Sequence, residues 1–197
     1  MAYTVKADVK EYLGIAAGNT GDDDLIDDLI DRAQAIIDAY CHRTFEASVD
    51  ATRKFDAIAD VDMNGRRLWL DEDLCAITTI TNGDAVAVTA TEYVTEPRNR
   101  TPWYALTIRA DANIVWTYGD YPEDAISIEG KWAWSTSAPN DIVKACLIIA
   151  EWLFRQKDTS ADIDRALIAD GIVVLPQSMP QIAQQILRPY IKRTRIV

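Results

Sequence analysis

Apolar residues recur every three or four positions at both ends of the chain and about every second position in between. A long helical stripe runs from residue 22 to residue 40, and a shorter one covers residues 4–13. Three aspartates at positions 22–24 suit the positive end of the longer helix's dipole. We predict three further helices, at 140–157, at 161–169 ending before Gly171, and between Pro180 and Pro189.

The predicted helix at 140–157 is apolar around most of its circumference. One face carries Ile142, Ala145, Cys146, Ile149 and Trp152, and Ile148 interrupts the narrow polar stripe. A helix of this kind has to be covered on several sides. We therefore expect it at the centre of the fold, at a subunit interface, or at both, with Ile142, Ile148, Ile149 and Trp152 as candidate interface residues.

Residues 51–131 show short alternating runs instead. The predicted strands are 52–55, 67–70, 76–81, 85–88, 104–109, 114–118 and 125–129. Asn82-Gly83 lies between two of these runs and is a strong hairpin signal, because both residues tolerate positive φ. Many short strands separated by turn residues predict a small antiparallel sandwich or barrel.

These patterns together predict an α+β protein. Its core would be a helical bundle of about five helices, with an antiparallel β-rich subdomain inserted into it. Residues 1–50 would supply the N-terminal helices of the core, and residues 51–131 the β-rich insertion. Residues 132–189 would complete the core, and residues 190–197 would form an extended basic C-terminal arm.

Charge separates the C-terminus from the rest of the chain. The net charge is −11, and the last 27 residues hold four basic residues and no acid, so the first 170 residues carry −15. An acidic body repels nucleic acid. The basic end could dock on an acidic surface or could simply be solvated, and composition does not separate these alternatives. The sequence has no apolar run of membrane-spanning length and no secretory signal, and its three scattered cysteines fit a reducing compartment.

Catalytic and metal-binding motifs are scarce. His42 is the single histidine, and its place at a helix end fits capping better than catalysis. The acids that begin at Asp22 fail the EF-hand pattern, because the sixth position is Asp27 and the twelfth is Ala33. There is no phosphate-binding glycine loop and no G-x-S-x-G sequence. We expect no enzymatic activity, no cofactor and no metal.

Aromatic residues in the β-rich region leave a second function open. Trp116, Trp132 or Trp134 could recognise a carbohydrate or a protein, which would make the region a binding module carried on a helical domain. Packing in the core of a β-sandwich is the interpretation we favour for these side chains.

Short phrases spread over most of the chain resemble a known family. They are YTVKADVKEYL at 3–13, the acidic helix at 22–40 followed by CHRTF, LDEDL at 70–74 before ITTI, TEY at 91–93, IEGKW at 128–132, and APNDI at 138–142 before the long apolar helix. This layout is similar to that of the head–tail connector proteins, also called adaptor or head-completion proteins, of long-tailed bacteriophages and prophages.

The resemblance implies a structural protein of the virion neck, made in the host cytoplasm. Its members form a ring, typically dodecameric, beneath the portal; the ring extends the DNA channel and offers a docking surface to neck or tail-completion proteins. The implied partners are other copies of the chain, the portal protein and the next neck or tail protein. Genomic DNA passes through without specific binding, and no membrane is involved.

The resemblance also suggests two candidate sites. The acids Asp22, Asp23, Asp24, Asp27 and Asp28 are candidates for lining the channel, where carboxylates would repel phosphates. The basic C-terminal arm, together with the residue that leads into it, is a candidate for binding a neighbouring subunit or the portal. The residues concerned are Arg188, Tyr190, Lys192, Arg193 and Arg195.

Overall fold

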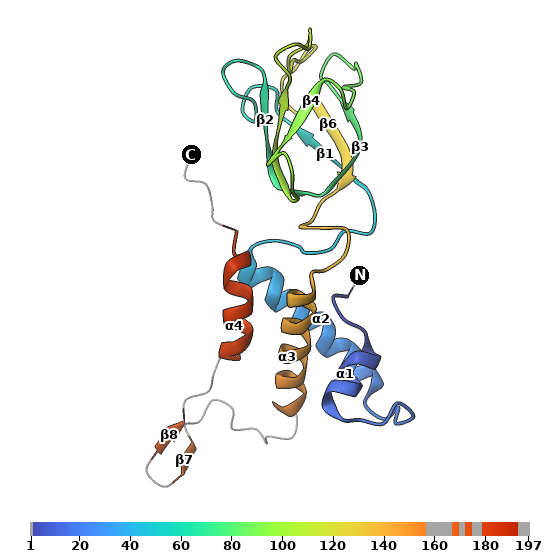
Figure 1. Cartoon of the computed structure of the whole chain (residues 1–197), viewed down its shortest axis with the longest axis vertical. Helices are drawn as coiled ribbons and strands as arrows, with labels where there is room; N and C mark the ends of the chain where they lie inside the picture. The colour runs from blue at the N-terminus through green and yellow to red at the C-terminus, as the bar shows by residue number, and fades with distance from the viewer. Residues whose placement is uncertain (1, 157–166, 170–171, 175–178, 193–197) are drawn as a thin grey trace. The chain divides into compact units, whose positions relative to one another are not determined.

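The computed structural model describes residues 2–156, 167–169, 172–174 and 179–192. The chain divides into two units (Figure 1). Arg43–Ala138 forms one, which we call the β unit, while Ala2–His42 and Pro139–Val197 form the other, which we call the helical unit. The chain therefore leaves the helical unit once, builds the β unit from a continuous segment, and returns.

The helical unit is organised around one helix. Its elements are α1 (Lys6–Leu13), α2 (Asp23–Cys41), α3 (Asn140–Gln156), α4 (Gln181–Leu187) and the short 3-10 helix η1 (Arg188–Tyr190). Helix α3 packs against α1, α2 and α4, so three helices of the same chain cover its apolar surface. This explains why α3 carries so few polar residues.

The prediction of a five-helix bundle core is wrong, although an α+β protein is broadly consistent with the structure. The described residues contain four α-helices. The described end of the predicted helix at 161–169 is a strand, β7 (Leu167–Ala169), which pairs with β8 (Ile172–Val174). The sequence signals were the β-branched residues of these strands and the Asp170-Gly171 dipeptide between them, a favoured hairpin sequence. The prediction of a helix that reaches residue 169 and ends before Gly171 is therefore wrong.

The β unit consists of two three-stranded antiparallel sheets. The strands are β1 (Ala51–Phe55), β2 (Arg67–Leu74), β3 (Ala76–Thr81), β4 (Tyr93–Glu96), β5 (Trp103–Ile108) and β6 (Ile126–Lys131), ordered β1-β6-β3 and β2-β5-β4. Side chains from both sheets meet in one core that includes Phe55, Leu68, Ile80, Leu106, Ile108, Ile126 and Ile128. Alternation along β6 places buried side chains toward this core.

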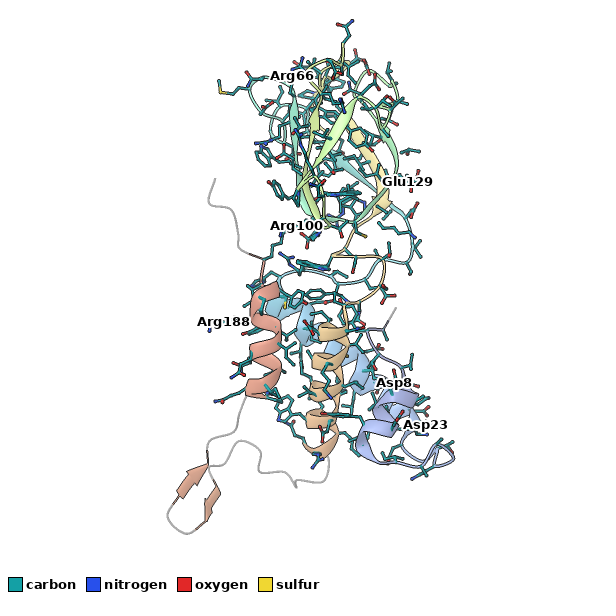
Figure 2. All side chains as sticks on the ribbon, in the orientation of Figure 1. Asp8, Asp23, Arg66, Arg100, Glu129 and Arg188 are labelled. Carbon is teal, nitrogen blue, oxygen red and sulfur yellow. The ribbon has the colours of Figure 1, made fainter. Side chains whose placement is uncertain are left out.

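The strand directions put the long connections of the β unit at one end. Strands β1 and β3 finish where β6 begins, and β5 finishes where β2 and β4 begin. The connections 56–66, 82–92 and 109–125 therefore share one end, which we call the loop end. The opposite end of the β unit holds the β4–β5 hairpin and the two segments through which the chain enters and leaves the unit. Arg66 and Arg100 mark these opposite ends in Figure 2.

Two predicted strands, 85–88 and 114–118, are not strands, and β4 was missed. For residues 114–118 the explanation lies in Asn82, which is buried at 4 % exposure. Its Nδ2 donates to the Val115 carbonyl at 2.9 Å, and its Oδ1 accepts from the Thr117 N–H at 3.1 Å. A side-chain amide thus satisfies backbone groups that a sheet partner would otherwise bond. The chain turns after Asn82, whose carbonyl accepts from the Ala85 N–H at 2.9 Å, but the positive φ, 64°, is at Ala85 and not at Asn82 or Gly83. The residues after Asn82 join only isolated bridges.

The two segments that enter and leave the β unit are bonded to each other. The Trp134 N–H donates to the Thr44 carbonyl at 2.9 Å, and the Ala47 N–H donates to the Ser135 carbonyl at 3.2 Å. Phe45 between them is fully buried. The segments are therefore part of the packed β unit.

Candidate functional site

The predicted channel acids divide into two groups in the structure, and the first group joins α1 to α2. Asp23 lies 2.5 Å from the Lys10 ammonium, and Asp27 lies 2.7 Å from that of Lys6. The hydrogen bond from Lys10 lowers the pKa of Asp23, and the hydrogen bond to Asp27 raises the pKa of Lys6. Lys10 is buried, so Asp23 has a structural role as its counter-ion.

Asp24 and Asp28 form the second group. Both are exposed, and within the described residues neither makes a hydrogen bond or an ion pair. They lie four residues apart on α2, an arrangement in which like charges destabilise a helix by a few tenths of a kcal/mol, about 0.2–0.5. Asp22 precedes the helix as its N-cap residue, without a side-chain capping bond. Among the five candidate channel acids, Asp24 and Asp28 are therefore the two that face solvent without an ion pair or hydrogen bond to a described residue.

The four candidate interface residues of α3 lie at different depths. Ile142 and Ile149 are fully buried and Ile148 is nearly so, while Trp152 is half-buried. The first three contribute to the core of the helical unit itself. Part of the Trp152 side chain is accessible and could contact another subunit. That contact stays a prediction.

The described part of the basic C-terminal segment is held on the helical unit. Arg188 is exposed in η1. The Tyr190 hydroxyl donates to Asp141 at 3.1 Å, and burial together with this contact raises the pKa of Tyr190. The Lys192 N–H donates to the Cys41 carbonyl at 2.8 Å. Arg193 and Arg195 lie outside the described residues.

The tryptophans proposed for a binding module are largely internal. Trp116 is 3 % exposed and its Nε1 donates to the Arg66 carbonyl at 3.0 Å, while Trp132 is 9 % exposed and donates to the Ala51 carbonyl at 2.8 Å. Trp134 is half-buried beneath the Arg43 guanidinium. Trp116 and Trp132 therefore act as core residues and do not offer a ring face for stacking.

A polar network on sheet β2-β5-β4 was not found from the sequence. Arg67 lies 2.6 Å from Glu96, and the Thr107 hydroxyl donates to the same carboxylate at 2.6 Å. Burial alone would raise the pKa of Glu96, but the hydrogen bonds from Arg67 and Thr107 outweigh it and lower the pKa. Arg67 and Glu96 are 29 positions apart along the chain, so only strand pairing reveals their contact.

The described residues show no obvious reactive centre. They contain no group of three or more His, Cys, Asp or Glu side chains placed to hold a metal ion. Cys41, Cys75 and Cys146 are buried, and burial raises the pKa of the Cys146 thiol to about 12. Within this part of the chain, none of the helices has the length and apolar character needed to cross a bilayer.

Comparison with known proteins finds similarity in structure but not in sequence. No protein-family model matches the chain, and no curated protein sequence matches it. A chain in the neck of an empty GTA particle, computed with C6 symmetry, matches with a TM-score of 0.57 and 12 % identity. A chain in the virion of a native gene transfer agent (GTA) particle matches with a TM-score of 0.59 and 14 % identity. Each match covers 99 % of our chain and 92 % of the other. The chain is therefore similar in fold to a component of each of these particles.

Proposed function

We propose that this protein is a structural component of the neck of a phage-like particle, with no catalytic role. The observation that carries the proposal is the fold match to a neck chain, which spans 99 % of our sequence and so includes both units. In this proposal the protein is made in the host cytoplasm and assembles into a ring between the portal and the tail. The ring extends the DNA channel and presents a docking surface to the next neck or tail protein.

The solvent-facing acids of α2 suit such a channel. Asp24 and Asp28 carry unpaired charge within the described residues, and carboxylates on a channel wall repel DNA phosphates. Asp23 and Asp27 are less informative for testing this idea, because their ion pairs hold α1 against α2. An image of the assembled ring with Asp24 and Asp28 on its outer wall would exclude the channel assignment.

The mass of the full-length protein in solution tests the proposed ring. We expect light scattering to detect a ring-sized species, either for the protein alone or after mixing with the portal protein of the same particle. Heterologous contacts between identical subunits close into rings, so a discrete large mass is the expected signature. A stable monomer that ignores the portal protein would contradict the proposal.

Removing the C-terminal arm should weaken attachment to the portal. Deletion of residues 190–197 is expected to reduce co-assembly with the portal protein, because it removes three of the four basic residues of the C-terminal segment. This deletion also removes the Tyr190–Asp141 and Lys192–Cys41 contacts. A second variant that lacks only residues 193–197 keeps both contacts and should show the same loss.

The matched control is Arg155→Gln, which removes an exposed positive charge from α3. It should leave co-assembly unchanged. If both truncated proteins bind the portal protein as the wild type does, the arm has no role in attachment.

A further inference from the structure

The loop end of the β unit gathers exposed apolar side chains. Among the residues whose burial the structure describes, eleven large hydrophobic side chains are exposed, and six of them lie on the three connections of the loop end. They are Ile58, Met63, Val86, Val115, Tyr118 and Tyr121. Met63 is fully exposed, and Tyr121 and Ile58 are exposed by 76 % and 61 %. Isolated apolar side chains on a surface are ordinary, but a concentration at one end of a unit marks an interaction site.

The three connections are bonded to one another. The side-chain amide of Asn82, on connection 82–92, is hydrogen-bonded to the backbone of connection 109–125. Connection 109–125 is also bonded to connection 56–66, because the Trp116 backbone N–H donates to the Gly65 carbonyl at 2.8 Å. The Ala57 N–H donates to the Pro122 carbonyl at 2.9 Å. A Cβ on Gly83 would lie 2.2 Å from the Thr117 carbonyl oxygen, so the backbones touch there. The exposed apolar side chains therefore lie on connections that hydrogen bonds hold to one another.

A surface arranged in this way is suited to binding. Fixing loops and side chains on association opposes binding, and a surface that is already ordered avoids much of that cost. The polar groups beneath the exposed apolar side chains are already satisfied by the bonds between the connections. The most exposed of the apolar side chains, Met63 and Tyr121, are covered little by their own unit.

Charge gathers at the same end. The three connections hold nine acids and two arginines, a net charge of −7. The rest of Arg43–Ala138 holds seven acids and seven basic residues, so the loop end carries all the net charge of the β unit. Asp120 and Glu123 are exposed beside Tyr121 in the sequence, and within the described residues neither makes an ion pair. The partner's contact surface should be positively charged at its border.

We propose that the loop end docks a different protein of the same particle, through an apolar patch bordered by lysine and arginine on that protein. Nucleic acid is disfavoured by the negative charge. The loop end of a second copy is disfavoured because like charges would face each other. The inference rests on the proposed neck function, because the expected partner is another protein of that particle. The loop end is a different surface from the C-terminal arm and the acids of α2.

Photo-cross-linking in assembled particles tests the proposal. A benzophenone amino acid is placed at position 63 or 121 of the full-length chain, with position 49 in the same unit and position 182 on α4 as exposed controls. Positions 63 and 121 should cross-link to one and the same other protein, at a peptide containing lysine or arginine, and the controls should not. Cross-links to a second copy of the chain, or yields no higher than at position 49, would overturn the proposal.

Substitutions supply a second, independent measurement. With the cross-linked protein purified as the probe, Tyr121→Ser should weaken binding about 30-fold if Tyr121 is a central anchor. The double variant Asp120→Lys and Glu123→Lys should weaken binding and reduce its dependence on salt. The control double variant Asp8→Lys and Glu11→Lys, on the exposed face of α1, should change neither. Unchanged affinity in all loop-end variants would overturn the proposal.

The two failures can be told apart. Particles that lack the chain altogether would overturn the proposed neck function and this inference with it. Particles that contain the chain, and in which positions 63 and 121 give no cross-link to another protein, would overturn the docking surface alone.

Discussion

Replacing Asp73 with alanine is expected to destabilise the β unit by about 3–5 kcal/mol, the usual cost of leaving one charge of a buried ion pair alone. Asp73 lies 3.4 Å from the Arg43 guanidinium, and their side chains are only 7 % and 11 % exposed. The guanidinium also lies over the Trp134 ring, 4.8 Å from its centre. In Asp73→Ala the positive charge stays in this confined place and loses its counter-ion.

Urea unfolding followed by tryptophan fluorescence measures the effect. Five of the six tryptophans belong to Arg43–Ala138, so the fluorescence change reports mainly on the β unit. A double variant, Arg43→Met with Asp73→Leu, should recover most of the lost stability, because apolar residues of similar volume replace a buried pair at little cost.

Asp71 provides a matched control on the same strand. It lies 2.6 Å from Arg53, but the two side chains are 59 % and 36 % exposed. Exposed pairs contribute about 0–1 kcal/mol, so Asp71→Ala should change the unfolding free energy by no more than that. If Asp73→Ala behaves like Asp71→Ala, the Arg43–Asp73 pair does not stabilise the β unit.

Sequence pattern located the elements whose signal is local. The predicted helix at 22–40 corresponds to α2 at Asp23–Cys41, and the predicted strand at 76–81 coincides with β3. The helix has regular apolar spacing over its whole length, and the strand is rich in β-branched residues and is followed by the turn residues Asn82-Gly83. His42 ends α2 in the left-handed conformation, at a φ of 53°. Glycine usually occupies this position, so a histidine there does not by itself predict the left-handed conformation.

The errors arise where distant residues decide the local structure. Residues 114–118 have the composition of a strand, but Asn82 and Gly65 bond their backbone from two other connections. The residues of β7 and β8 form short apolar runs, and such runs are compatible with either a strand or a helix. Their sequence alone therefore does not decide between the two structures. Strand β4 belongs to the second sheet because it pairs with β5. The four residues of β4 alone do not predict this pairing.

The candidate sites show the same division. The sequence displays a run of acids at the start of α2, but not that Lys10 and Lys6 neutralise two of them across the helix pair. It displays scattered apolar residues in the loops, but their gathering at one end follows from strand direction. The sequence therefore predicts which kinds of residue form a candidate site. Only the fold shows which of these residues face solvent and which hold the structure together.

Replacing Gly130 with alanine should be among the most damaging small substitutions in the β unit. Gly130 lies on β6, the central strand, and pairs with Ala51 on one side and Ile77 on the other. An added Cβ would lie 2.2 Å from the Ala76 carbonyl oxygen and 3.1 Å from a Leu74 methyl carbon. A bulge in β3 brings the Ala76 backbone toward this point, and close approach of this kind is where a strand requires glycine.

We expect Gly130→Ala to cost about 3 kcal/mol or more, at the upper end of overpacking effects, because the atom it meets belongs to a paired backbone and has little room to move. Tryptophan fluorescence should show an unfolding midpoint at much lower urea, or no folded β unit. Gly18→Ala is the control: its Cβ would meet nothing within 4 Å, so its effect should stay within about 0.5 kcal/mol. A wild-type midpoint for Gly130→Ala would mean that β3 and β6 can separate at the bulge without loss.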